Sequence, residues 1–139
     1  MNTIRLRQSD YAKIIDHAKA GLPYESCGLI AGTVDGEIKT VQHVFLLTNI
    51  DQSREHFSMN PREQLAAIKE MRTNGWSPLG NFHSHPETPA RPSAEDIRLA
   101  FDSSASYLIL SLAEVEPILR AFHIENGQAS AENVECINE

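Results

Sequence analysis

One stretch of the chain constrains its fold and chemistry most. It reads His83-x-His85-Pro86, then six residues, then Ser93-x-x-Asp96. Apolar residues lead into His83, and a strand there would point His83 and His85 to the same face, because side chains alternate along a strand. Their Cα atoms would lie about 6.5–7 Å apart at a rise of about 3.3 Å per residue. Both imidazoles can then converge on one metal ion.

The second half of this stretch can bring a carboxylate to the same ion. Three prolines make the connection extended and stiff. Ser93 then opens a helix-like run, which places Asp96 in its first turn. Two histidines and an aspartate suit zinc and leave a fourth position open for water, which is typical of catalytic sites. Two other interpretations stay open: Ser-x-x-Asp also resembles a helix capping box, and paired histidines near prolines occur in surface loops.

The complete motif resembles the metal motif of the JAMM, or MPN-plus, metalloproteases. An upstream segment, Glu25-Ser26-Cys27-Gly28-Leu29-Ile30-Ala31-Gly32, is similar to the pattern Glu-x-Cys-Gly-Leu-x-x-Gly of small stand-alone bacterial members. The resemblance spans nearly the whole chain. It implies one zinc ion per chain, bound by His83, His85 and Asp96, and a catalytic glutamate at Glu25.

Composition limits the class of protein and its compartment. The chain has 139 residues, enough for one domain over residues 1–139. Its net charge of −7 argues against a nucleic-acid surface or an anionic membrane surface. No apolar run suits a signal peptide or a membrane span, so we expect a cytoplasmic protein. Cys27 and Cys136 form no paired motif, and both are expected to be buried free thiols.

Hydrophobic periodicity predicts an α/β domain with a mixed sheet and helices packed against it. The expected strands are 3–7, 27–34, 37–47, 56–59, 76–85, 107–112, 118–125 and a last strand through Val134 and Ile137. The first helix buries a stripe of Tyr11, Ile14, Ile15 and Ala18, with His17 in solvent. The second begins at Pro61 and buries Leu65, Ile68 and Met71. The third begins at Ser93, with Ile97, Ala100 and Phe101 facing inward. The resemblance implies the MPN (JAB-like) fold, a curved sheet flanked by helices, similar to the cytidine-deaminase architecture.

Amide hydrolysis at such a site needs more than a metal. A bound zinc ion lowers the pKa of water towards about 7, and a carboxylate must carry the proton to the leaving amine. Glu25 is the candidate through its match to the glutamate of the family; the alternative is a solvated loop residue. The Ser93 hydroxyl can donate a hydrogen bond to the tetrahedral oxyanion, and losing such a donor typically costs about 3–4 kcal/mol. Its alternative role is to cap the helix, and the two roles are compatible.

Other polar residues have weaker signals. Cys27 faces either the site or the core, and we expect the core. Structural roles are expected for three further histidines, namely His43, His56 and His123. Glu87 and Arg91 lie in the proline-rich connection, where they are either solvated or in contact with substrate.

The resemblance also implies a substrate. Such enzymes cut peptide or isopeptide bonds after ubiquitin-like proteins, and the small bacterial members act on sulfur-carrier proteins after a terminal glycine pair. A carrier tail can bind by adding a strand to an exposed sheet edge. Two alternative functions remain: a non-catalytic scaffold domain without metal, and a zinc hydrolase of a small molecule. The oligomeric state stays open, with a homodimer as one option. Against a zinc deaminase, the chain lacks the Pro-Cys-x-x-Cys ligands.

Overall fold

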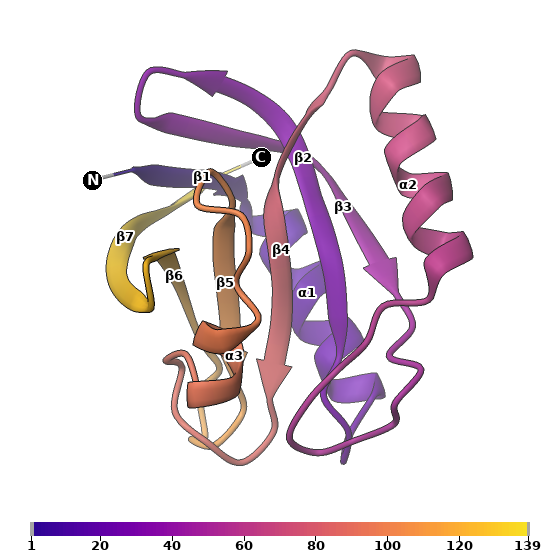
Figure 1. The fold of residues 1–139 in the computed structure, drawn as a ribbon, viewed down its shortest axis with the longest axis vertical. Helices are drawn as coiled ribbons and strands as arrows, with labels where there is room; N and C mark the ends of the chain where they lie inside the picture. Colours follow the sequence, from indigo (N-terminus) through magenta and orange to yellow (C-terminus); the bar gives the residue numbers. More distant parts are fainter. Residues whose placement is uncertain (1, 139) are drawn as a thin grey trace.

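Helices interrupt a succession of strands in the computed structural model, which describes residues 2–138 (Figure 1). The elements are β1 (Thr3–Arg7), α1 (Gln8–Ala20), β2 (Cys27–Asp35), β3 (Ile38–Leu47), α2 (Pro61–Asn74), β4 (Ser77–His85), α3 (Ala94–Arg98), β5 (Ser106–Ser111), β6 (Ile118–Glu125) and β7 (Gln128–Ile137).

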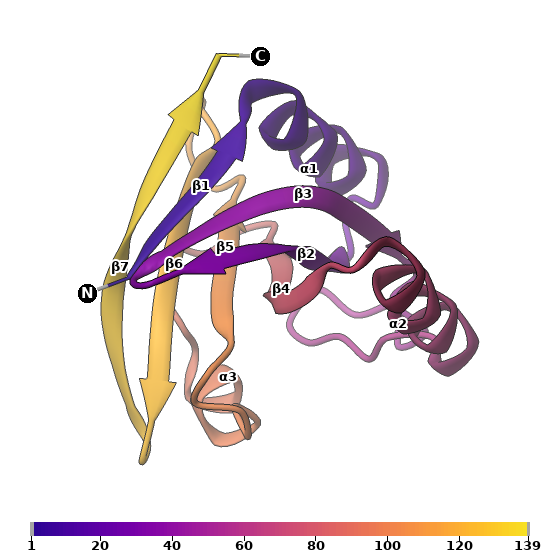
Figure 2. The ribbon, with the colours of Figure 1, turned by 90° about the horizontal axis from the view of Figure 1, so that it is seen from above.

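The sheet is mixed, as expected, but it closes on itself. Its strand order is β1-β3-β2-β4-β5-β6-β7, and β1 pairs in parallel with both β3 and β7. β4 and β5 are also parallel, and the other pairs are antiparallel. The register of β2 shifts near Ala31 against both of its neighbours, and such irregularities bend strands. The expected curved sheet is therefore a closed barrel, with β1 as the closing strand (Figure 2).

The central strands carry apolar clusters on both faces. On one face α1 contributes Ile14 and Ala18 to a cluster built on Phe82 and Leu108. On the other face α2 contributes its buried residues to a cluster that contains Cys27, Ala31, Phe45, Leu47, Ala67 and Met71. The glycine that follows Cys27 is needed here, because a Cβ at Gly28 would overlap the Phe82 ring. Cys27 lies in the core, as expected.

Helix α2 begins and ends where its sequence predicts, but it buries a different face. Asn60 caps it and Pro61 is its first residue, and Gly75 ends it in a left-handed conformation with φ 69°. Ala67 and Met71 are the buried residues, whereas Leu65 is 55% exposed and Ile68 also lies outside the core. The small Ala67 lets the helix approach the sheet closely, which turns the larger Leu65 outward.

Side chains from α1 and from Arg7, which precedes it, donate hydrogen bonds to carbonyls of β3 beyond the short pairing of β3 with β1. Arg7 Nη2 donates to the Gln42 carbonyl at 3.0 Å, and Lys13 Nζ donates to the Val44 carbonyl at 2.9 Å. His17 Nε2 lies 3.1 and 3.0 Å from the carbonyls of Cys27 and Leu47. The prediction of a solvated His17 is therefore wrong.

Three other local predictions are wrong. Helix α3 ends at Arg98, and Phe101 is 86% exposed, because Asp102 and Ser104 form a local polar turn. Residues 56–59 form no strand, and Asn49 and Met59 make an isolated bridge. Cys136 is exposed on β7 rather than buried. Within residues 2–138, the helices are too short or too polar to span a membrane.

Candidate metal centre

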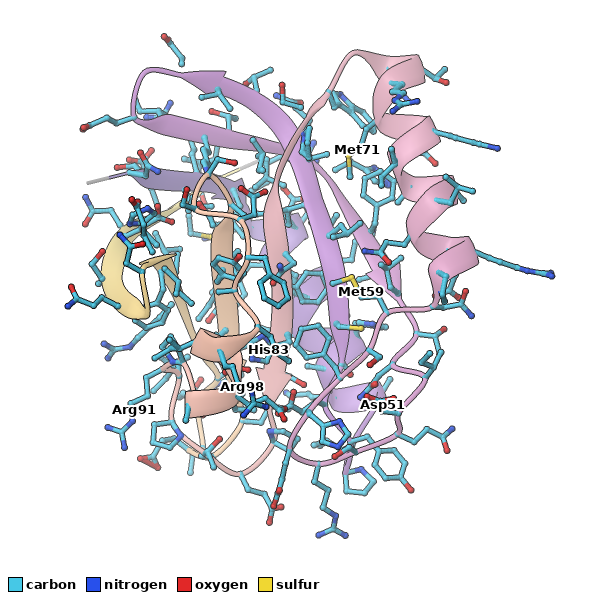
Figure 3. The ribbon with its side chains drawn as sticks, in the orientation of Figure 1. Asp51, Met59, Met71, His83, Arg91 and Arg98 are labelled. Atoms are coloured by element: carbon cyan, nitrogen blue, oxygen red, sulfur yellow. The ribbon has the colours of Figure 1, made fainter. Side chains whose placement is uncertain are left out.

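His83, His85 and Asp96 meet in one cluster at the end of β4. The two histidines share a face of the strand, as their spacing predicts, and their Nε2 atoms lie 3.0 Å apart. Asp96 Oδ2 lies 3.2 Å from each of these nitrogens. Figure 3 shows His83 beside α3, which carries Asp96. The structure therefore brings these three predicted side chains together.

A capping box at the start of α3 holds Asp96 in this position. The Ser93 hydroxyl oxygen accepts a hydrogen bond from the Asp96 backbone N–H at 3.0 Å. The Ser93 backbone N–H donates in return to Asp96 Oδ2 at 2.9 Å. The same carboxylate oxygen faces both histidines. Asp96 therefore takes part in the capping box and in the cluster at the same time.

The two imidazoles are positioned differently. His85 Nδ1 lies 2.9 Å from the Pro89 carbonyl, so Nδ1 carries the proton and the lone pair of Nε2 points at the cluster. The His83 ring stacks on Phe57, with centroids 4.8 Å apart. His83 Nδ1 is buried and makes no hydrogen bond. Both rings are held by neighbours, so their Nε2 atoms are fixed relative to Asp96.

This donor set fits a divalent metal ion. Ligand atoms bound tetrahedrally at about 2.0–2.2 Å from zinc lie about 3.3–3.6 Å apart, close to the separations of 3.0 and 3.2 Å in the cluster. Asp96 Oδ2 lies within hydrogen-bond reach of both Nε2 atoms, and a shared cation would also account for the 3.0 Å approach of the two nitrogens to each other. Within residues 2–138, this is the group of side chains that gathers closely enough to hold a metal ion.

Charge and burial favour a neutral His83 and an ionised Asp96, the states that a metal site needs, but they favour a protonated His85. Burial lowers the pKa of His83, which keeps its imidazole neutral. Burial alone would raise the pKa of Asp96, but hydrogen bonds from His83 and His85 outweigh it and lower that pKa. Burial would also lower the pKa of His85, and the hydrogen bond to Asp96 raises it instead. A metal ion would displace the proton of His85.

Glu25 lies beside the cluster and is buried. Only 4% of it is exposed, so the alternative of a solvated loop residue does not hold. Its backbone is tied on both sides: its N–H donates to the Ser53 carbonyl at 2.7 Å, and its carbonyl accepts from Asn49 Nδ2 at 3.0 Å. Its Oε1 is buried without a hydrogen-bond partner. Burial raises the pKa of Glu25 to about 8, which the charge of His85 opposes and that of Asp96 reinforces.

The remaining candidates lie outside the cluster. Burial, with the charges of Glu63 and Glu25, raises the pKa of the Cys27 thiol to about 12, so this thiol is protonated and unreactive. Glu87 is exposed and lies 3.9 Å from Arg54, and Arg91 is exposed.

The three other histidines all have neighbours of their own. His43 stacks on Trp76 with a centroid distance of 5.2 Å. His56 lies 3.1 Å from Asp51, and His123 lies 3.1 Å from Glu125.

Three residues at the site have no signal in the sequence analysis. Asn49 donates from Nδ2 to the carbonyls of Glu25 and His56, and its Oδ1 accepts from two backbone N–H groups of the loop. Phe57 supplies the ring that stacks on His83. Asn81 lies two residues before His83 and has a buried Oδ1 without a partner. Only Asn81 was open to inference, because it shares the strand face of His83 and His85.

Comparison with known proteins identifies the family. The model of the prokaryotic homologues of the JAB domain matches residues 7–125. The chain is 29% identical to a CysO-cysteine peptidase of Mycobacterium tuberculosis, over 91% of this chain and 86% of that protein. It is 34% identical to a probable TtuB-protein conjugate cleaving protease of Thermus thermophilus, over 83% of this chain and 72% of that protein. The solution structure of a Desulfitobacterium hafniense protein superposes with a TM-score of 0.91 at 53% identity, over 98% of this chain and 94% of that one.

The family match covers most of the chain, including the segment of Glu25 and the whole His83–Asp96 motif. The named relatives are peptidases or proteases that cleave conjugates. The chain therefore belongs to the prokaryotic JAB-domain family, in its stand-alone JAMM branch, and is a hydrolase.

Proposed function

We propose that this protein is a zinc-dependent peptidase that hydrolyses the peptide or isopeptide bond after the C-terminal Gly-Gly of a ubiquitin-like sulfur-carrier protein. The observation that carries this proposal is the buried Glu25 carboxyl with an unpartnered Oε1 beside the cluster of His83, His85 and Asp96. An unsatisfied buried carboxyl is costly, and a substrate or water beside it would satisfy it.

The proposed roles follow from the chemistry of each group. Zinc at the three-residue cluster would lower the pKa of a water molecule and polarise the scissile carbonyl. Glu25 takes the proton from the attacking water and delivers it to the leaving nitrogen, a role that its buried position beside the cluster suits. The Ser93 hydroxyl accepts one hydrogen bond from Asp96 N–H, and its own hydrogen can be donated to the oxyanion.

The substrate class rests on the relatives. The named relatives act on CysO-cysteine and on TtuB-protein conjugates, and we extend this kind of substrate to the present chain. A glycine pair suits an access path walled by side chains, because glycine has no Cβ and adopts extended shapes closed to other residues. The partner is then a folded carrier with a flexible tail.

Cleavage of defined carrier adducts tests the proposal. The zinc-loaded protein is incubated with carrier proteins extended beyond Gly-Gly, and the products are read by mass spectrometry. We expect a single cut after the second glycine. A carrier with valine in place of the penultimate glycine should resist cleavage while zinc stays bound. Equal cleavage of that valine variant, or faster turnover of a free dipeptide than of the carrier adduct, would contradict the proposal and favour a small-molecule hydrolase.

A further inference from the structure

A cavity of about 220 Å³ opens beside the cluster, on the side of β5 and α3. His83 and Asp96 form one end of it. Its walls are mainly apolar and come from a loop, a helix end and two strands: Phe57, Leu99, Ile109 and Ile124. Besides His83 and Asp96, the lining includes the polar residues Glu95 and Asn81, and Asn81 Oδ1 is buried without a hydrogen-bond partner. The proposed chemistry leaves both the cavity and this acceptor unused.

Strand register places the cavity and Glu25 on opposite sides of the cluster. Cys27 pairs with His83, and Leu29 pairs with Asn81. The antiparallel pairing continues through the hydrogen bond from Ser84 N–H to the Ser26 carbonyl. Glu25 is therefore opposite His85 on the β2 side. Asn81, His83 and His85 follow one another along one face of β4, and Asn81 lies at the end away from His85. On the β5 side, Asn81 pairs with Tyr107.

This arrangement sets the direction of a bound tail. Glu25 protonates the leaving nitrogen in the proposed function, so the leaving group lies on the Glu25 side. The acyl portion, which is the carrier tail, then extends to the opposite side and reaches the cavity. An extended chain advances about 3.3 Å per residue, so the residue before a terminal Gly-Gly lies about 7 Å from the terminal glycine. Asn81 lies two residues before His83, at a comparable distance from the cluster.

We propose that the cavity binds an apolar side chain on the residue that precedes Gly-Gly, and that Asn81 Oδ1 accepts a backbone N–H of the same tail. The inference rests on the proposed function and deepens it. Apolar walls favour an apolar side chain through area removed from water. A buried acceptor without a partner needs a donor, and every residue of the tail except proline offers one. The cavity thus selects the tail, while the cluster and Glu25 act on the bond.

Two site variants and one matched control separate these roles. Leu99 is 51% exposed, so Leu99→Ala shortens a cavity wall with little loss of core. Leu65→Ala is the control, because Leu65 is also about half exposed but lies on α2, away from the cavity. Asn81→Leu removes the acceptor at nearly constant volume. It also removes an unpaired buried polar atom, so the melting temperature should be unchanged or higher.

The experiment measures binding of tail peptides to the zinc-loaded protein by calorimetry. The peptides end in Gly-Gly carboxylate and carry leucine, alanine or aspartate before it; as products they cannot be cut again. We expect the leucine peptide to bind roughly tenfold more tightly than the alanine peptide and the aspartate peptide to bind most weakly. Leu99→Ala should reduce this preference, and Leu65→Ala should keep it. Asn81→Leu should lower the affinity for all three peptides by a similar factor.

Two results would overturn the inference. One is equal binding of the three peptides by the wild-type protein. The other is an Asn81→Leu variant that melts lower and binds as tightly as wild type, which would make the amide structural. The matching adducts are also assayed for cleavage. Cleavage without a preference for leucine removes the cavity proposal alone. A preference in binding without cleavage of any adduct removes the proposed reaction and leaves the cavity proposal standing.

Discussion

Two ionisable side chains, Lys39 on β3 and Glu25 before β2, are buried to a similar extent but differ in their hydrogen-bond partners. Lys39 is 7% exposed, and its Nζ donates to the Leu79 and Ser104 carbonyls at 3.2 and 2.7 Å and to Ser106 Oγ at 2.8 Å. An ammonium has three N–H donors, so all are used. Glu25 is buried as deeply, and its Oε1 has no partner.

This difference separates a structural charge, whose donors are all paired, from a buried carboxyl with an unpartnered oxygen. Lys39 ties β3 to β4 and to the turn before β5, and its bonds offset the cost of burial. Around the cluster the opposite holds: Glu25 Oε1, Asn81 Oδ1 and His83 Nδ1 are buried and unpartnered. Within the described residues, Glu132 Oε1 is the other such side-chain atom. Unsatisfied polar atoms are rare in folded proteins, so their concentration at one place indicates a site built for a ligand.

The largest effect is expected from Glu25→Gln, which keeps the shape of the side chain and removes its basicity. General acid–base catalysis contributes about 10²–10⁴-fold, so kcat on a carrier adduct should fall by at least that order. Zinc content should stay the same, because Glu25 is outside the cluster of ligands. Single-turnover cleavage measured by mass spectrometry checks this. Turnover near the wild-type rate would assign the base to another residue.

A smaller effect, on stability and not on chemistry, is expected from Lys39→Met. Methionine would leave three oxygen acceptors unsatisfied, and we expect the free energy of unfolding to fall by about 2–4 kcal/mol. Urea unfolding measures this, with Lys69→Met as the control, because Lys69 is exposed on α2. The folded variant should cleave adducts at close to the wild-type rate. If Lys39→Met unfolds at the same urea concentration as the control, Lys39 is not the structural charge described above.

A third effect is a dependence of stability on pH in the metal-free protein. Burial raises the pKa of Glu25 from 4.5 to about 8, so between these values the folded state binds more protons than the unfolded state. The free energy of unfolding contributed by Glu25 therefore decreases as pH rises from about 4.5 to about 8. Asp96 acts in the opposite sense, since its pKa is lowered, but only below pH 3.8.

Metal-free Glu25→Gln lacks this titration. Its stability relative to metal-free wild type should therefore increase between pH 5 and pH 8, as measured by urea unfolding. A difference that stays constant across this range would show that Glu25 is not held in its neutral form.

Local spacing predicted the geometry of the cluster, because the relevant constraints are local. The period of two along β4 gives His83 and His85 one face, and the first turn after Ser93 brings Asp96 back to them. The register of β2 with β4, which puts Glu25 near His85, depends on contacts distant in sequence, and the resemblance to the family was needed to select Glu25.

Errors occurred where tertiary contacts override local patterns. His17 looks solvated by helical periodicity, yet it binds two carbonyls near the β3 edge. Closure of the barrel depends on the pairing of β1 with both β3 and β7, and a five-residue strand does not specify its partners. Asn81 is a polar residue in an apolar strand, and its position in a cavity wall follows only from the neighbouring β5 and α3.

Zinc titration of three proteins shows directly whether His83 and His85 hold a metal ion. Wild type, Glu25→Gln and the His83→Ala/His85→Ala double variant are stripped with a chelator, and zinc binding is followed by competition with a chromophoric chelator. We expect one zinc ion per chain for wild type and for Glu25→Gln, with similar affinity, and none for the double variant. Retention of one zinc ion with wild-type affinity by the double variant would show that the metal ion is held elsewhere.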